Sequence, residues 1–380
     1  MVSVENIRPQ DLTAADRDAW RALCAATPAL RSPLLGPDFA EAVGRRRSDA
    51  YVAVARRDGR AVGFLPHHRR PTGFARPIGA TFSDYHALAG DPGAPLDGPE
   101  LLAAAGLRTL RFSNLIDPFA SFSAVAQTVD EGFAIHLGPD GAEAYLQNIR
   151  AANTKRAKNW RRLEHKLDRE MGEVSLIVDD RSREAFETLI HWKRRQLIMT
   201  GRHDVLRPDW SLGLMRDLFE ARGGPLEGLM MTLRAGGRVV AGHFGVRLGD
   251  HFHSWISAAD PEAAAVGAGN TLMLRAIAAL PEAGLSHFDM GPSHGHYKEP
   301  FCTSRVACAA GVANRAGAGS IGQIGPRALA LAAGRSQAMA RMLRRIDHIA
   351  ATELSIGGRV RGVVEALCGH GRRPHTPAEA

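Results

Sequence analysis

Short hydrophobic runs, broken by Gly, Pro and charged residues, mark the first half of the chain as mixed α/β. They predict strands at residues 3–8, 51–56, 60–66, 109–112 and 133–137. Hydrophobic positions that recur at helical spacing predict helices at residues 14–26, 37–46 and 101–106. The Asp58-Gly59 step between two of these strands tolerates positive φ, so it predicts a tight hairpin.

The second half has a clearer order of elements. The pattern predicts a strand, two helices, a meander of three strands, a helix and two further strands. Their ranges are 174–178, 182–199, 209–222, 226–234, 238–248, 251–258, 270–280, 287–290 and 305–312. Between the halves, residues 141–171 are basic and carry a hydrophobic stripe at helical spacing, which predicts one long linking helix.

One stretch of sequence occurs in both halves. Residues 51–62 (YVAVARRDGRAV) align without a gap with residues 229–240 (LMMTLRAGGRVV). Self-similarity of this kind indicates duplication of one unit. Two unrelated hairpins are the alternative, because hairpins are common.

Composition points to two globular domains with an anionic partner. The chain has 380 residues, of which 45% are hydrophobic and 23% charged, so it has enough apolar surface for two cores. The net charge of +8 is concentrated in residues 155–169 and 335–373 and favours nucleotide cofactors, nucleic acid or lipid headgroups, with solvated helix faces as the alternative. The four cysteines have no metal-site spacing and no histidine partners, so we expect neither a disulfide framework nor a metal site.

The sequence shows no targeting or membrane-spanning pattern, and it ends in a basic segment. Residues 1–10 have no apolar core of a signal peptide, and no run reaches the length of a membrane span, so we expect a cytoplasmic protein. Residues 335–349 predict a basic amphipathic helix. Docking of this helix onto the body is favoured over peripheral membrane contact, and residues 371–380 read as a disordered tail.

The order of elements in the second half resembles the core of the GNAT acyltransferases. The resemblance implies that the helix after the meander presents free backbone N–H groups to the pyrophosphate of acetyl-CoA or another acyl-CoA, with glycines that allow close approach. The implied cofactor residues are Ser257, Gly267, Gly269, Asn270 and Thr271. A plain helix entry is the alternative, and Ala264 stands where the usual GNAT loop carries Gln or Arg.

A series of short motifs over residues 30–312 resembles the CelD-like, cellulose-biosynthesis-associated acetyltransferases. The motifs are Ser83-Asp84-Tyr85, Lys155-Arg156-x-x-Asn159-Trp160-Arg161-Arg162-Leu163-Glu164, Trp192-Lys193-Arg194-x-Gln196, Val240-Ala241-Gly242-His243-Phe244, Phe288-Asp289-Met290-Gly291 and Tyr297-Lys298-x-x-Phe301. The resemblance implies tandem GNAT domains and acyl transfer from CoA, often to polysaccharides.

We therefore predict an α/β (α+β) fold of two tandem GNAT-like domains. A degenerate first domain spans residues 1–140, the linking helix 141–171, the CoA-binding domain 172–316, and a basic helical extension with a tail 317–380. The first domain has no obvious phosphate loop before a helix, so we expect it to supply walls of the substrate site.

Direct acyl transfer needs a group that takes a proton, a group that stabilises the oxyanion and an acid for the thiolate. The candidate catalytic residues are His243, Asp289, Tyr297 and Lys298. The candidate substrate-binding residues are Asp84, Tyr85, Trp192, Arg194, Gln196, His253 and Trp255. Purely structural roles are the alternative for each of them: packing for the rings, turn capping for Asp289, solvation for Lys298.

The expected partner is a small-molecule or saccharide acceptor, such as a polysaccharide or cell-envelope precursor. Two other functions stay open. One is a Fem-type transferase that uses aminoacyl-tRNA, which the positive charge suits. The other is a non-catalytic scaffold of a polysaccharide-synthesis system. We expect no DNA binding, because the sequence shows no helix-turn-helix, zinc finger or aromatic-basic strand pattern.

Overall fold

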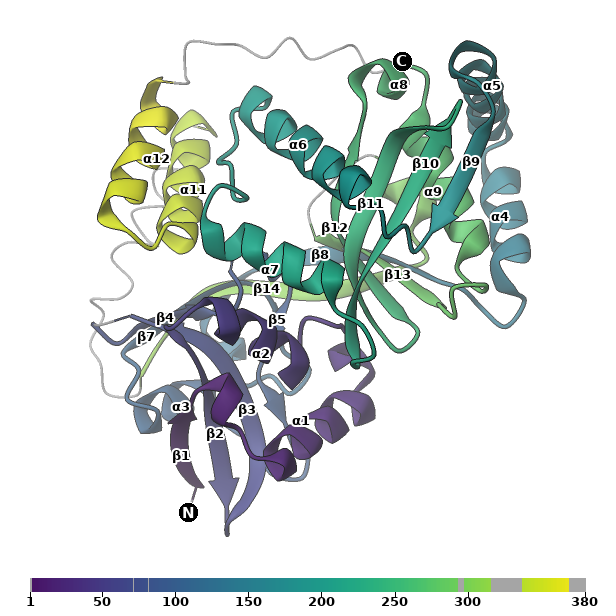
Figure 1. Ribbon diagram of the computed structural model, residues 1–380. Helices are drawn as coiled ribbons and strands as arrows, with labels where there is room; N and C mark the ends of the chain where they lie inside the picture. Colours follow the sequence, from purple (N-terminus) through teal and green to yellow (C-terminus); the bar gives the residue numbers. More distant parts are fainter. Residues whose placement is uncertain (1, 71, 81, 293–296, 316–336, 369–380) are drawn as a thin grey trace.

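The computed structural model describes residues 2–70, 72–80, 82–292, 297–315 and 337–368, and its strands form one sheet across both halves of the chain (Figure 1). The strand order is β1-β2-β3-β4-β7-β14-β8-β13-β12-β11-β10-β9, and two short strands pair at the side, β5 with β7 and β6 with β3. Neighbouring strands are antiparallel except β4–β7, β5–β7 and β12–β13.

The first half contains the strands β1 (Val2–Ile7), β2 (Ala50–Arg57), β3 (Arg60–Arg69), β4 (Phe74–Pro77), β5 (His86–Ala87), β6 (Ala89–Gly90), β7 (Thr109–Ile116) and β8 (Ala126–His136). Its helices are α1 (Ala14–Ala26), α2 (Pro37–Arg46) and α3 (Gly98–Ala104). The predicted elements are confirmed, whereas β4, β5 and β6 lie in the Gly- and Pro-rich passage where no strand was predicted.

The second half contains β9 (Val174–Val178), α6 (Arg183–Met199), α7 (Asp209–Glu220), β10 (Leu226–Ala235), β11 (Arg238–Leu248), β12 (His251–Ala259), α8 (Pro261–Ala265), α9 (Ala268–Ala279), β13 (His287–Pro292) and β14 (Ser304–Asn314). This is the predicted order with the short helix α8 added. The α/β fold class is thereby confirmed.

The linking segment differs from the prediction. It contains two helices, α4 (Gly141–Ala152) and α5 (Thr154–Met171), in place of one. Asn153 lies between them with non-helical backbone angles, and its side chain accepts a hydrogen bond from the Arg156 N–H. An asparagine that caps a new helix in this way ends the preceding one.

The two halves exchange a strand at the centre of the sheet. β8 follows the first half in sequence but pairs with β13, and β14 follows the second half but pairs with β7. The exchanged strands also pair with each other, from Ser304 opposite Ala134 to Gly311 opposite Ala126. The halves are therefore joined by a continuous backbone ladder rather than by side-chain contacts alone.

The hairpins that share sequence also share their irregularities. The β2–β3 register shifts between Ala55 and Arg56, and the β10–β11 register shifts between the aligned residues Leu233 and Arg234. Gly59 and Gly237, which align as well, both have φ of 79°. Bulges are specific backbone features, so their coincidence favours duplication over two unrelated hairpins.

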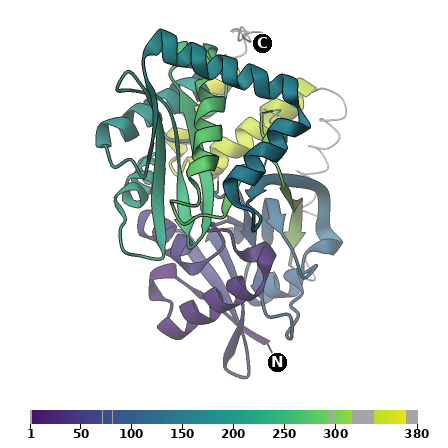
Figure 2. The same ribbon diagram turned by 90° about the vertical axis from the view of Figure 1, so that its right-hand side faces the viewer.

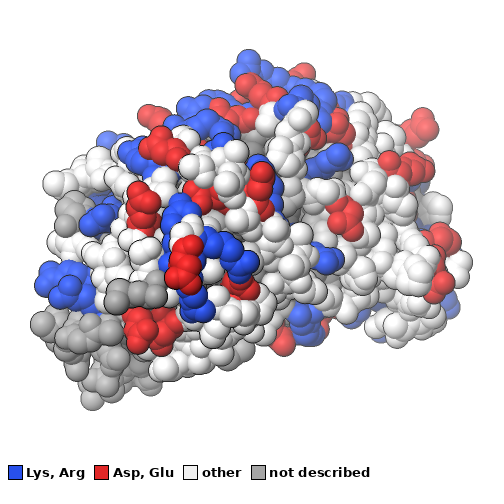
Figure 3. Space-filling view, turned by 90° about the horizontal axis from the view of Figure 1, so that it is seen from below, with Lys and Arg blue, Asp and Glu red and all other residues white. Residues whose placement is uncertain are grey.

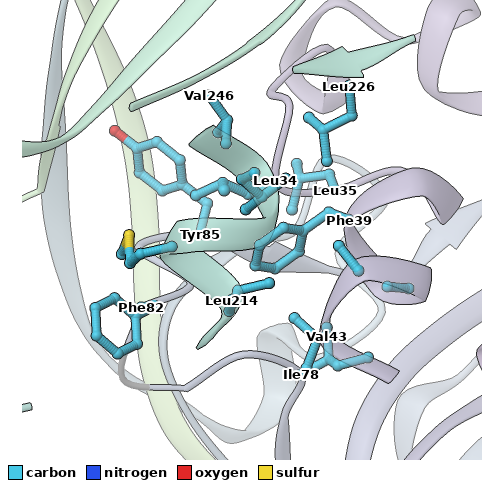
Figure 4. Packing of buried hydrophobic residues seen from close by; sticks show 14 of the residues in the cluster. Leu34, Leu35, Phe39, Val43, Ile78, Phe82, Tyr85, Leu214, Leu226 and Val246 are labelled. Atoms are coloured by element: carbon cyan, nitrogen blue, oxygen red, sulfur yellow. The ribbon is translucent and has the colours of Figure 1, made fainter. Parts of the chain in front are cut away.

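Helices cover both faces of the sheet, and one hydrophobic core crosses the boundary between the halves. Figure 4 shows Phe39 and Val43 of α2 close to Leu214 of α7, and all three are fully buried in the same cluster. On the outside of this contact, Arg46 forms an ion pair with Asp217. On the other face of the second half, α4 and α5 lie in front of α9 (Figure 2).

Two C-terminal helices, α11 (Gln337–Thr352) and α12 (Ile356–Cys368), pack on both halves. Asp347 accepts from Arg76 at 2.6 Å and forms an ion pair with Arg111 at 3.0 Å, both in the first half. Trp210 of the second half donates to the Thr352 carbonyl at 2.9 Å. The predicted helix at residues 335–349 thus docks on the body, and the predicted tail lies outside the described residues. Within the described chain, no helix has the length and hydrophobicity to span a membrane.

We expect Asp347→Ala to lower the free energy of unfolding by about 1–3 kcal/mol, because it leaves two half-buried guanidinium groups without their carboxylate. Urea unfolding followed by circular dichroism measures this. Glu131→Ala is the matched control, since it removes the equally short but exposed Arg305 pair and should change stability little. Equal effects of the two substitutions would show that α11 contributes nothing specific.

Candidate functional site

The site lies where two neighbouring strands of the second half part. β12 and β13 pair in parallel only from His251 opposite His287 to His253 opposite Asp289. Beyond that point β12 continues beside β11 to Ala259, while β13 continues beside β8. Backbone groups on the facing edges of β12 and β13 are therefore available to a ligand between them.

An acid–histidine cluster from both halves lies at the parting point. His253 Nε2 is 2.9 Å from Asp84 Oδ2, and His253 Nδ1 is 3.5 Å from Asp289 Oδ2. Tyr85 donates its hydroxyl to Asp289 at 3.0 Å. Asp289 also accepts from the Gly291 N–H at 2.7 Å, so the turn-capping role considered for it is present too.

Glycine 132 on β8 makes room for the tyrosine of this cluster. A Cβ atom added to Gly132 would lie 1.9 Å from the Tyr85 hydroxyl oxygen. Any larger residue at this position would displace the tyrosine from Asp289, because protein interiors do not tolerate such overlap. The exchanged strand therefore takes part in shaping the site.

His253 is a buried cation. Burial by itself favours the neutral ring, but the charge of Asp289 and hydrogen bonds to Asp289 and Asp84 raise the pKa of His253 to about 9. The imidazole is fully buried, whereas the Asp84 side chain is 34% exposed. One face of this charged cluster is thus open to a ligand.

Two lysines complete the polar lining. Lys193 of α6 donates to the Ser257 carbonyl on β12 at 3.4 Å, and burial, with the charges of Arg202 and Lys298, lowers its pKa to about 8. Lys298 is buried and donates to the carbonyls of Gly291 and Pro292. Burial also lowers the pKa of Lys298, while Asp84 and Asp289 act in the opposite direction.

A neutral histidine, His243, lies on β11, opposite Ser257 of β12. His243 is buried, and burial together with the charge of Lys193 lowers its pKa to about 4. Its Nδ1 is 3.4 Å from the Ser254 hydroxyl, while its Nε2 has no hydrogen-bond partner within the described chain. This ring nitrogen keeps its capacity to form a hydrogen bond.

The loop before α9 has the properties of a phosphate cradle. Gly267 has φ of 85°, and no side chain caps the helix. No described residue accepts from the backbone N–H groups of Ala268, Gly269 or Asn270. Gly269 is exposed, and a Cβ there would meet nothing within 4 Å. Free donors at an open helix N-terminus fit the pyrophosphate of an acyl-CoA.

Comparison with known proteins agrees with this geometry. Residues 154–299 match the family model described as Acetyltransferase (GNAT) domain. The matched residues run from α5 to just beyond β13 and contain the parting strands and the phosphate cradle, which supports an acyltransferase of the GNAT type. No curated protein matches the sequence.

Three solved structures are similar to the chain at low sequence identity. FemX is 10% identical with a TM-score of 0.50, over 81% of this chain and 96% of FemX. A tandem GNAT protein from the clavulanic acid biosynthesis pathway is 13% identical with a TM-score of 0.45, over 82% and 98%. The C-terminal domain of a putative lysylphosphatidylglycerol synthetase from Agrobacterium fabrum is 13% identical with a TM-score of 0.45, over 77% and 89%.

The fold brings together some of the predicted residues and separates others. Asp84, Tyr85, His253, Asp289 and Lys298 meet in one cluster. Ser257 accepts from Lys193, and His243 contacts Ser254 and Phe288. Thr271 is buried behind the cradle. Tyr297 is 53% exposed at the edge of the site.

The remaining predicted substrate residues lie at the margin of this cluster or outside it. Arg194 forms an ion pair with Asp204, on the loop after α6, at 2.9 Å. Trp255 packs on Phe39 and Phe82 in the core between the halves. Trp192 is half-buried on α6, and Gln196 accepts from Lys193 at 3.2 Å.

Lys193 was missed as a site residue, although it belongs to the Trp192-Lys193-Arg194 motif. Its helix neighbours Trp192 and Arg194 attracted the assignment because of their size and charge. Only the crossing of α6 over β12 distinguishes Lys193 from them. The signal available in the sequence was the motif itself.

We expect His253 to make stability depend on pH. Its pKa in the fold, about 9, lies above the ordinary 6.5, so its contribution is complete below pH 6.5 and is lost as pH rises through 9. Lys193 and Lys298, whose pKa values are lowered, act in the opposite direction. The free energy of unfolding of wild type minus that of His253→Gln should therefore fall by roughly 2–3 kcal/mol between pH 6 and pH 10.

Urea unfolding of both proteins at several pH values isolates this difference, because the lysines are common to both. Parallel pH profiles for wild type and His253→Gln would show that the imidazole is not held as a cation.

Proposed function

We propose that this chain transfers an acyl group, acetyl in the first instance, from acyl-CoA to an amine or hydroxyl of a small or saccharide acceptor. The parting of β12 and β13 carries the proposal, because the acid–histidine cluster lies at the parting point and the open cradle at α9 follows β12 in the chain. A polysaccharide or cell-envelope precursor is the proposed acceptor class, consistent with the CelD-like motifs.

The polar wall of the site suits an acceptor with several hydroxyl or amino groups. Asp84 and Asp289 are acceptors, Lys193 and Lys298 are donors, and the charge of Asp84 acts on the pKa values of both lysines. Saccharides present such donors and acceptors at close spacing. The side chains Asp84 and Tyr85 come from the first half, which supports its proposed role as a wall of the substrate site.

Asp84 is the proposed group that takes the acceptor's proton. It is the more exposed of the two carboxylates, at 34% against 16% for Asp289. His253 holds its ring between them and keeps two like charges compatible. As the acceptor bonds to the acyl carbon, the proton passes to Asp84 and from there to solvent.

Lys193 is the proposed acid for the leaving sulfur. Acyl-CoA supplies a thioester whose carbon–sulfur bond breaks with the electron pair going to sulfur. Lys193 protonates that sulfur. With a pKa of about 8, the side chain is charged near neutral pH and releases its proton more easily than an ordinary lysine. His243 of β11, whose Nε2 has no hydrogen-bond partner among the described residues, is proposed to orient the acyl group.

We expect Gly269→Trp to abolish acetyl-CoA binding, because an indole would fill the open entrance of α9. Isothermal calorimetry should show at least a tenfold loss of affinity. Gly269→Ala is the matched control and should bind within threefold of wild type, since its Cβ meets nothing. Absence of binding in wild type would favour the scaffold or an aminoacyl-tRNA donor instead.

We expect the activity to fall above pH 8 as Lys193 loses its proton. Arg cannot release a proton in this pH range, so Lys193→Arg and Lys193→Met should both lower kcat by roughly 10²–10⁴-fold below pH 8. The residual activity of both variants should no longer fall near pH 8. A limb that stays near pH 8 in either variant would assign the titration to another group.

A further inference from the structure

One face of α5 is entirely basic. Its basic side chains recur at helical spacing and line a shallow hollow of about 500 Å³; they are Lys158, Arg161, Arg162, His165, Lys166 and Arg169. Only Glu170 offers them an acidic partner among the described residues, at 3.9 Å from Lys166 and 3.6 Å from Arg169. We call these six residues the α5 basic face.

This charge pattern is unfavourable for the helix alone. Like charges three and four residues apart on a helix repel each other. Figure 3 shows mixed charges on another face, where Lys and Arg lie beside Asp and Glu. An unbalanced helix face indicates that an anion lies against it when the protein is at work.

The α5 basic face adjoins the cradle of the GNAT domain. A Cβ on Gly267 would lie 2.9 Å from Leu163 of α5, so this helix touches the loop before α9. Glu164 pairs with Arg275 of α9 at 2.8 Å, and Leu167 packs with Val266 and Ala268. Because residues three apart are neighbours on a helix, Lys166 is the cation next to the Leu163 contact, with Arg162 beside it.

The cradle itself supplies no positive side chain. Residues 260–271 contain Asp260 and Glu262 but no Lys, Arg or His. Backbone N–H groups at α9 serve a pyrophosphate, yet CoA carries a further phosphomonoester on its ribose. That group has about two negative charges near neutral pH and needs a cation within reach.

We propose that the α5 basic face, through Lys166 and Arg162, binds the 3′-phosphate of CoA. The inference rests on the proposed function. It assigns donor recognition to the helix that links the halves, and it places the positive charge outside the loop where Ala264 stands. Neither side chain touches the acid–histidine cluster, so both act on donor affinity and not on the chemical step.

The test compares CoA with 3′-dephospho-CoA, which differs only in the phosphate concerned. Calorimetry on wild type should give at least tenfold tighter binding of CoA, and this advantage should shrink as salt is raised. The Arg162→Ala/Lys166→Ala double variant should lose at least tenfold in CoA affinity and keep its affinity for dephospho-CoA. In turnover, KM for acetyl-CoA should rise with kcat unchanged.

Lys155→Ala is the matched control, an exposed cation three turns away on the same helix, and it should retain the tenfold preference. The proposal is overturned if the double variant keeps the preference or loses both ligands equally. It is also overturned if the double variant loses salt-dependent RNA binding but no CoA affinity, which would assign the face to nucleic acid. Failure of wild type to bind either ligand removes the proposed function as well, whereas loss of the preference alone leaves it standing.

Discussion

The exchange of β8 and β14 is the constraint on which the rest of the structure depends. Each strand ends one half of the sequence but completes the sheet of the other, so neither half has a finished sheet by itself. The exchange fixes the distance and angle between the halves through backbone hydrogen bonds. Asp84 and Tyr85 can therefore meet His253 and Asp289 at hydrogen-bond distance, although about 170 to 200 residues separate them in sequence.

Burial and charge then act together at this junction. Two carboxylates beside the fully buried imidazole raise the pKa of His253 to about 9 and so favour its cation, and the cation in turn allows the carboxylates to lie close. Removing His253 would leave Asp84 and Asp289 without the positive charge between them. This mutual dependence ties the geometry of the site to the folding of both halves, and it explains why a glycine is needed at position 132 of the exchanged strand.

The parts of the fold that depend on local pattern were predictable from the sequence. The β10–β11–β12 meander has alternating or continuous hydrophobic runs and glycine turns, and the Gly267–Gly269 loop marks the helix entrance. The exchange of β8 and β14 was not predictable, because it is a pairing between distant segments whose hydrophobic patterns suit either half equally. The break at Asn153 was a missed local signal, since the residue is a strong helix cap.

The candidate site divides in the same way. Asp84, Tyr85, His253 and Asp289 were found through motifs, but their meeting depends on the strand exchange. Lys193 was missed because its role depends on which side of α6 faces β12. The Trp192-Lys193-Arg194-x-Gln196 motif has large side chains on several sides of the helix, so the sequence does not show which of them faces the sheet. Trp255 was assigned to the substrate on its alternation with His253, whereas its ring packs against aromatic residues of the first half.

The two halves share a hairpin framework, but only the second has an open phosphate cradle. α3 in the first half occupies the place of α9, since each precedes the strand that meets the exchanged pair. The N-terminus of α3 is filled: Asp97 accepts from the Glu100 N–H, and Phe122 lies where a side chain on Gly98 would be. A carboxylate in that position repels a phosphate, while the N-terminus of α9 is open and uncapped. Leu65 also stands where the alignment of the hairpins places His243, within a hydrophobic cluster. These differences support an arrangement in which the first half contributes side chains to the acceptor side, while the donor is bound by the second half together with the linking helix α5.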